Sequence, residues 1–198
     1  MGLRLHYIDG QTPLAEEEIA GLRIPGIATR GELDEFEQQN IEQAIQWTLS
    51  RSFKTERVFT VDFIKSVHRR MYADVWTWAG KFRETEKNLG VLPWQIALEL
   101  KKLLDDALFW HENKTCTPDE IALRFKHRLV SIHCFSNGNG RHSRLMADII
   151  IEKLFRLPVF SWGLANLSDT GDPRAAYLKA IKTADQGDYK LLLAFARS

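Results

Sequence analysis

The stretch 133–144, His-Cys-Phe-Ser-Asn-Gly-Asn-Gly-Arg-His-Ser-Arg, carries the strongest structural signal in this chain. Two of its glycines flank an asparagine, and such a turn lets successive backbone N–H groups point the same way and form an anion-binding nest. Apolar residues at helical spacing precede and follow the stretch. The following helix would add its N-terminal amides and the positive end of its dipole. The stretch therefore predicts a phosphate-binding loop between two helices.

Charged side chains of the same loop add to this prediction. Arg141 and Arg144 are three residues apart, so they project from nearby positions on the first turn of the following helix. Guanidinium groups bind phosphate oxygens through forked hydrogen bonds. His133 stands at the entrance of the loop, where an imidazole can take a proton from an incoming hydroxyl. Taken singly, these features are more often a plain turn, a structural histidine or a solvated helix face, but their combination favours a polyphosphate site.

The rest of the chain is predicted to be mainly helical. Thr117-Pro118-Asp119-Glu120 combines a capping residue, a proline at the first helical position and a capping-box glutamate. The helical period is interrupted over residues 81–95 by charged residues, by Asn88-Leu89-Gly90 and by Pro93. This favours an irregular hairpin or exposed flap. We therefore expect an all-α fold with one small flap. Its other helices are expected to begin near Thr29, Thr60, Ile96, Arg141, Asp172 and Asp188.

Size and composition limit the possible classes of protein. The 198 residues, 44% of them hydrophobic, suffice for one domain over 29–198, and the Pro- and Gly-punctuated residues 1–28 are expected to pack on it as an arm. The 27 basic and 26 acidic residues give a net charge of +1, which disfavours direct nucleic-acid binding. Cys116 and Cys134 suggest no disulfide framework, and no apolar run approaches membrane-spanning length. We expect a cytoplasmic protein without a membrane partner.

The loop resembles the signature of Fic (filamentation induced by cAMP) proteins, which is His-x-Phe-x-Asp/Glu-Gly-Asn-Gly-Arg-x-x-Arg. The resemblance extends from about residue 29 to the end of the chain and includes 76–83, Trp-Thr-Trp-Ala-Gly-Lys-Phe-Arg. Details of 76–83 and 137–142 are similar to one subgroup, called mobile mystery protein B. The resemblance implies a Fic-type helical bundle with a small β-hairpin flap.

The resemblance also implies an AMP transferase, which moves AMP from ATP to a Ser, Thr or Tyr hydroxyl of a target protein and releases pyrophosphate. His133 would be the general base, and Arg141 would bind the outer phosphates and balance charge on the leaving pyrophosphate. Arg144 would hold the γ-phosphate, and Tyr177 would border the adenine. Gly138, Asn139 and Gly140 would cradle the phosphates. The target would pair by its backbone with the flap, at Arg83, Leu89, Gly90 and Val91.

One position departs from the family pattern. Asn137 stands where the family has Asp or Glu as the ligand of Mg²⁺, and an amide oxygen brings no negative charge to a cation. Three interpretations remain open: a metal-weak AMP transferase, an enzyme that uses another nucleotide or phospho-donor, and a protein that binds nucleotide without transfer. We favour the first because His133 and both arginines are retained. The form of residues 138–141 argues against Doc-like phosphotransfer.

Inhibition is a further open point. Many Fic proteins are inhibited by a helix that carries Ser/Thr-x-x-x-Glu-Gly/Asn. Here Thr12–Glu16 is followed by Glu17, and Ser52–Glu56 is followed by Arg57, so both near-matches fail at the last position. The sequence therefore favours either an inhibitory antitoxin-like partner, as in a toxin–antitoxin pair, or a transferase activity low enough for the cell to tolerate.

Three further side chains near the loop and flap need an interpretation. His127 and His142 flank His133 at spacings that match no standard zinc pattern. We expect His127 to pack or hydrogen-bond within its helix and His142 to lie on the surface of the next one. Trp94, beside Pro93, is the tryptophan that we expect to contact a target.

Overall fold

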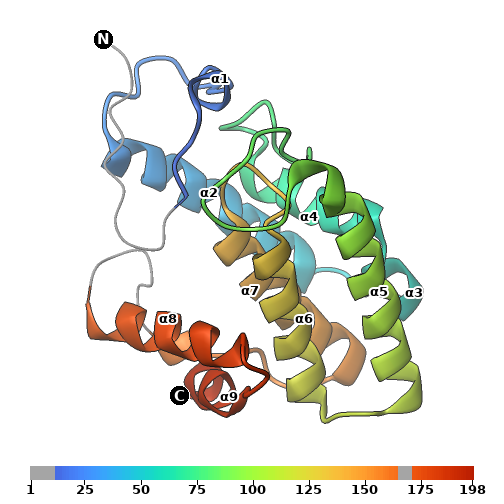
Figure 1. Ribbon diagram of the computed structural model, residues 1–198. Helices are drawn as coiled ribbons and strands as arrows, with labels where there is room; N and C mark the ends of the chain where they lie inside the picture. Colours follow the sequence, from blue (N-terminus) through green and yellow to red (C-terminus); the bar gives the residue numbers. More distant parts are fainter. Residues whose placement is uncertain (1–11, 165–170) are drawn as a thin grey trace.

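The computed structural model describes residues 12–164 and 171–198, and these form a helical bundle (Figure 1). α6 and α7 pack against each other, with α5 against α6 and α4 against α7. α2 packs on α4, and α8 and α9 form a pair beside α6. The helices are α1 (Glu16–Ile19), α2 (Arg30–Leu49), α3 (Thr55–Val58), α4 (Val61–Tyr72), α5 (Ile96–Asn113), α6 (Pro118–Ile132), α7 (Asn139–Ile149), α8 (Asp172–Ala184) and α9 (Lys190–Arg197).

Local capping interactions explain where three of the helices begin. Thr29, Thr60 and Thr117 each accept a hydrogen bond from the backbone N–H three residues later, at three of the predicted helix starts. α7 begins two residues before the predicted start and continues as a π-helical turn over Ile150–Leu154. Within the described ranges, no helix is both long enough and apolar enough to cross a membrane.

The core lies between α4, α5, α6 and α7. Ile64, Leu103, Phe125 and Ala147 have no exposed surface, and one residue of the loop, Phe135, is equally buried among them. Burial of a side chain such as Ile64, Leu103 or Phe125 contributes roughly 1.5–3 kcal/mol. The loop between α6 and α7 is thus anchored in the same core that holds the helices together.

Residues 12–28 are the described part of the predicted arm. They pack against residues 75–87, which precede the loop in the sequence. Arg23 N–H donates to Val75 O at 2.8 Å, and Thr77 N–H donates to Gly21 O at 2.9 Å. The buried carboxylate of Glu18 accepts from Thr85 Oγ1 at 2.7 Å and pairs with Lys87. Residues 1–11 of the predicted arm lie outside the described residues.

The predicted β-hairpin flap is wrong, because no pair of strands forms among residues 81–92. Arg83 N–H donates instead to Cys134 O at 3.0 Å, and Val91 N–H donates to Ile132 O at 3.3 Å. The guanidinium of Arg83 donates to His133 O at 2.6 Å, to Thr85 O at 2.8 Å and to Val91 O. The backbone of this segment therefore bonds to the loop and to its own buried Arg83 side chain, rather than pairing as two strands.

We expect the substitution Arg83→Lys to lower the free energy of unfolding by about 2–4 kcal/mol, because one ammonium group cannot serve three carbonyls in this geometry. Urea denaturation measures the loss, and limited proteolysis should show faster cleavage within residues 84–90. Arg57→Lys, at an exposed position on α3, is the matched control and should leave both unchanged. Equal stability of Arg83→Lys and the parent chain would contradict this role.

Candidate active site

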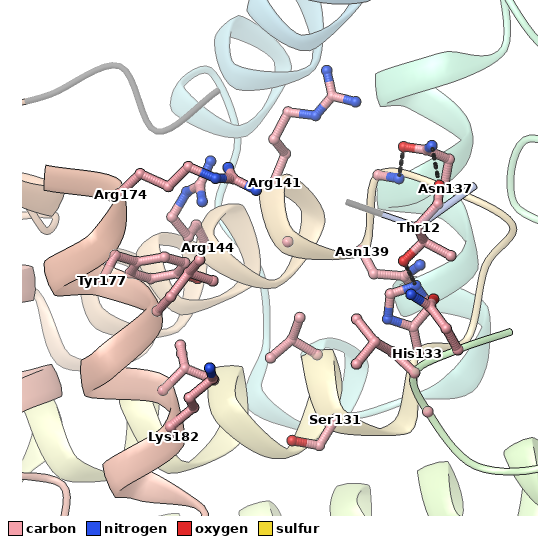
Figure 2. A pocket seen from close by; sticks show the side chains of 18 of the residues that line it. Thr12, Ser131, His133, Asn137, Asn139, Arg141, Arg144, Arg174, Tyr177 and Lys182 are labelled. Carbon is pink, nitrogen blue, oxygen red and sulfur yellow. Dashed lines mark hydrogen bonds between the residues drawn. The ribbon is translucent and has the colours of Figure 1, made fainter. Parts of the chain in front are cut away.

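A cavity of about 610 Å³ lies between the loop, the ends of α6 and α7, and α8 (Figure 2). Arg83 and Val91 are absent from its lining, since Arg83 is buried behind the loop. The cavity brings together most of the residues that the sequence singled out: Leu89, Gly90, His133, Asn137, Gly138, Asn139, Gly140, Arg141, Arg144 and Tyr177.

His133 follows the last turn of α6 in the left-handed conformation, with φ of 58°. Its Nε2 lies 3.0 Å from the hydroxyl Oγ1 of Thr12, and the ring also hydrogen-bonds to the Val130 carbonyl. Burial lowers the pKa of His133 to about 4, and the nearby Arg83 cation contributes. Because the donated proton goes to the carbonyl, Nε2 is left as an acceptor for a hydroxyl. His133 is therefore a neutral base that faces the cavity.

Gly90 forms the wall next to this histidine. Its φ of 95° favours glycine, and an added Cβ would lie 2.5 Å from His133 Cβ. A side chain here would therefore push the segment 88–90 away from the base. The glycine keeps the approach to His133 narrow.

The loop is held in shape by side chains at its two ends. Asn139 Nδ2 donates to Phe135 O at 2.7 Å, and its Oδ1 accepts from Phe135 N–H at 3.0 Å. The Phe135 ring stacks on His68 with centroids 3.7 Å apart. His68 in turn accepts from Gly80 N–H at Nδ1, so its Nε2 donates to Asn137 O at 3.1 Å.

His68 is a positioning residue that the sequence analysis did not assign. It is completely buried, and burial holds the pKa of His68 well below its usual range, so the ring remains a single neutral tautomer. Its one signal in the sequence is its place four residues after Ile64, on the apolar face of α4.

The N-terminus of α7 leaves room for an anion. Gly138 precedes α7 with φ of 76°, and an added Cβ would lie 2.4 Å from the Tyr72 ring, so only glycine fits. By contrast, a Cβ on Gly140 would meet only open space. The amides of residues 139–141 precede the first hydrogen bond of the helix, which His142 N–H donates to Gly138 O at 2.9 Å. These amides therefore have no partner within the helix, which is what the predicted anion-binding nest requires.

The two arginines of the loop have different surroundings. Arg141 Nη2 lies 2.6 Å from Glu37 Oε2, and that buried glutamate also accepts from Trp76 Nε1 at 2.7 Å. Burial alone would lower the pKa of Arg141, but Glu37 raises it above its usual range. Arg144 lies over the Tyr177 ring, 5.7 Å from its centroid. Arg141 is thus fixed from α2, and Arg144 extends toward α8.

α8 adds cations that the sequence analysis missed. Arg174 and Lys182 line the cavity on either side of Tyr177 (Figure 2). They lie eight residues apart, and that helical spacing with Tyr177 between them was the available signal. Burial alone would raise the pKa of Tyr177, but Lys126 and Arg144 lower it. The lining then holds five cations, Arg30, Arg141, Arg144, Arg174 and Lys182, against the carboxylates of Asp34 and Asp185.

The donor set does not fit a resident divalent cation. Asn137 Oδ1 already accepts from Gly138 N–H at 2.6 Å, and Asp34 is engaged by Arg30 at 2.9 Å. Across residues 12–164 and 171–198, no group of three or more His, Cys, Asp and Glu side chains could hold a metal ion. A cation at this site would need ligands from a bound molecule.

The two other histidines near the loop have structural surroundings. The prediction that His142 lies on the surface is wrong: it is buried, its ring meets Phe135 edge-on, and its Nε2 lies 3.1 Å from Ile64 O. It sits on the side of α7 that packs against α4, and burial lowers the pKa of His142 to about 3. His127 is also buried, but its Nε2 bonds across to Asp185 Oδ1 at 2.8 Å.

Comparisons with known proteins agree with this architecture. Residues 58–151 match the model of the Fic/DOC family. The protein adenylyltransferase Fic of Nematostella vectensis is 26% identical over 178 residues, which cover 88% of this chain and 39% of that protein. The chain spans well under half of the length of the curated relatives that it matches.

Solved structures show the same fold. Residues 134–508 of Fic-1 from Caenorhabditis elegans align with a TM-score of 0.66 and 23% identity, over 90% of this chain and 50% of that one. BepC from Bartonella tribocorum, solved with bound AMPPNP, aligns with a TM-score of 0.66 and 17% identity, over 92% and 97% of the two chains. The match to the Fic/DOC family model thus covers just under half of this chain, and the solved structures share its fold.

Proposed function

We propose that this chain is a protein AMP transferase that moves AMP from ATP to a Ser, Thr or Tyr hydroxyl. The observation that carries the proposal is the hydrogen bond between a hydroxyl and the neutral His133, in the same cavity as the N-terminus of α7 and two arginines. A base and a polyphosphate cradle in one cavity are what transfer of a phosphoryl-linked group to a hydroxyl needs.

The cavity offers a place for each part of ATP. The amides of residues 139–141 and the side chains of Arg141 and Arg144 would hold the phosphates, with Arg174 supplying further charge. Tyr177 would border the adenine, because it lies on α8 opposite the loop (Figure 2). The several positive charges that line the cavity are suited to a triphosphate. Arg141 would balance the charge that develops on the leaving pyrophosphate.

The proposed step needs only groups in the cavity and the two substrates. His133 Nε2 takes the proton of the target hydroxyl, and the oxygen attacks the α-phosphorus of ATP. The bond from that phosphorus to the bridging oxygen of the β-phosphate breaks, and pyrophosphate leaves with the electron pair. His133 then releases its proton to solvent, which its low pKa favours.

The names of relatives support the proposal. The matched proteins of Nematostella vectensis and Caenorhabditis elegans are named protein adenylyltransferases, and BepC was solved with an ATP analogue. The resemblance of 76–83 and 137–142 to mobile mystery protein B supports placement in that subgroup.

The substrate target would dock beside the base. Leu89 and Gly90 line the cavity, and the nearby Trp94 is 71% exposed. We propose that a target segment lies along residues 89–94. An antitoxin-like partner fits the absence of an inhibitory motif in the sequence, and the free thiols of Cys116 and Cys134 fit a cytoplasmic location.

Three other functions would give different outcomes at the same site. A phosphotransferase would move the γ-phosphate, and a nucleotide-binding protein would move neither label. Another nucleotide donor would leave ATP labels in solution while a different nucleotide labels the target.

Label transfer from ATP is the central test. We expect the chain to transfer α-phosphate label, and no γ-phosphate label, to proteins of a host lysate, and His133→Ala to reduce that transfer at least 100-fold because the base is lost. Labelled proteins are counted after denaturing electrophoresis. His127→Ala, which removes a histidine outside the cavity lining, is the matched control and should retain transfer. Transfer of γ-label, or unchanged transfer by His133→Ala, would contradict the proposal.

The pH dependence follows from the buried base. His133 acts in its neutral form, which predominates above its pKa of about 4. We therefore expect kcat/KM for transfer to be lost only as the pH falls toward about 4, and not near the ordinary histidine pKa of about 6.5. Initial rates of labelling between pH 4 and 8 measure this, with circular dichroism at each pH as the control for folding. Half-loss of activity near pH 6.5 in a folded protein would contradict it.

The amide at position 137 should limit the use of Mg²⁺. The side chains do not hold a metal alone, so Mg²⁺ would enter with the phosphates of ATP. We expect Asn137→Asp to lower the Mg²⁺ concentration for half-maximal labelling roughly tenfold, because a carboxylate adds a charged oxygen. A Mg²⁺ titration at fixed ATP measures this, and Asn88→Asp, elsewhere in the cavity lining, is the matched control. An unchanged midpoint in Asn137→Asp would show that this side chain does not reach the cation.

A further inference from the structure

The part of the cavity next to His133, where a target hydroxyl would bind and which we call the acceptor side, already contains a hydroxyl of this chain. Thr12 lines the cavity, and its Oγ1 lies 3.0 Å from His133 Nε2 (Figure 2). Since the other ring nitrogen of His133 donates to Val130 O, the Thr12 hydroxyl is the donor in this hydrogen bond. That is the arrangement of a hydroxyl and the base that would deprotonate it.

Several contacts hold Thr12 at this place. Its carbonyl faces Asn137 Nδ2 at 3.5 Å, and the next carbonyl, of Pro13, accepts from Lys87 Nζ at 2.8 Å. Ala15 N–H donates to Glu18 Oε2 at 2.8 Å, and Glu18 pairs with the same Lys87. Thr12 is itself buried. The segment is thus seated against the loop by a connected set of polar contacts.

The segment fills the acceptor side and leaves the phosphate side of the cavity open. The carboxylates of Glu16 and Glu17 belong to exposed residues, and that of Glu18 is turned to Thr85 and Lys87. No acidic side chain of the described residues 12–28 lines the cavity beside Arg144. An inhibitor would compete with the phosphates there, whereas Thr12 occupies only the place of an incoming hydroxyl.

We propose that Thr12 is an acceptor of AMP within the same molecule, which rests on the transferase function proposed above. His133 Nε2 takes the hydroxyl proton, and Thr12 Oγ1 attacks the α-phosphorus of ATP. The bond to the β-phosphate oxygen breaks, so pyrophosphate leaves and a phosphodiester joins AMP to Thr12. The modified residue is too large for the place that the hydroxyl occupied, so the segment must leave the base, and the acceptor side becomes free for a target.

The test uses the 198-residue chain with ATP and Mg²⁺ and reads the site of modification by peptide mass spectrometry. We expect one AMP on the peptide that contains Thr12, at a first-order rate constant that does not change over a tenfold range of protein concentration. Thr12→Ser should keep the modification because it keeps the hydroxyl. Thr12→Val, which has nearly the same shape but no hydroxyl, and His133→Ala should lose it at least 100-fold.

Lysate labelling in the same reactions separates this proposal from the function on which it rests. Thr12→Val should label lysate proteins more slowly than the parent chain, because its segment cannot be modified and stays beside His133, although the groups assigned to catalysis are intact. Labelled lysate proteins together with an unmodified Thr12 would overturn the present proposal and leave the transferase function in place. A rate constant that rises in proportion to protein concentration would overturn transfer within one molecule. If no chain labels either Thr12 or a lysate protein, both proposals fall.

Discussion

The closure of the loop by Asn139 is the interaction on which the rest of the site depends. One side-chain amide bonds to both the N–H and the carbonyl of Phe135, which fixes the ends of the turn relative to each other. Phe135 is in turn stacked on His68 inside the core. His133 lies before this turn and the amides of α7 lie after it. The distance between the proposed base and the proposed phosphate site is therefore set by a buried amide and a buried ring.

Burial keeps the histidines of this region neutral, while the arginines stay charged. Desolvation lowers the pKa of His133, His68 and His142, so the imidazoles stay neutral among many cations. A guanidinium group keeps its charge under the same conditions, and Glu37 reinforces this for Arg141. The site can thus place a proton acceptor beside anion-binding groups without either of them titrating near neutral pH. That combination follows from residue type and depth rather than from any one contact.

Local signals made the helices and the loop predictable, and non-local contacts account for the failures. Thr29, Thr60 and Thr117 cap helices through residues three positions away, which a sequence shows directly. The predicted hairpin failed because the Arg83 side chain bonds to the carbonyl of His133, 50 residues away in the sequence. His142 was misplaced because the first turn of a helix does not reveal which side its neighbours will cover. The cations of α8 reach the cavity only through tertiary packing.

The amide at position 137 connects the departure from the family pattern with the segment that precedes α1. A carboxylate at this position could accept hydrogen bonds or bind a cation, but it could not donate to the carbonyl of Thr12 as the Asn137 amide does. The same side chain accepts from Gly138 N–H, so both of its ends are used within the protein. With an amide in place of a carboxylate we expect a weaker hold on a metal ion, and the side chain gains a donor to the backbone carbonyl of Thr12. We therefore expect metal dependence and the position of Thr12 beside His133 to be coupled through Asn137, since a cation that draws the amide oxygen would also turn its nitrogen away from residue 12.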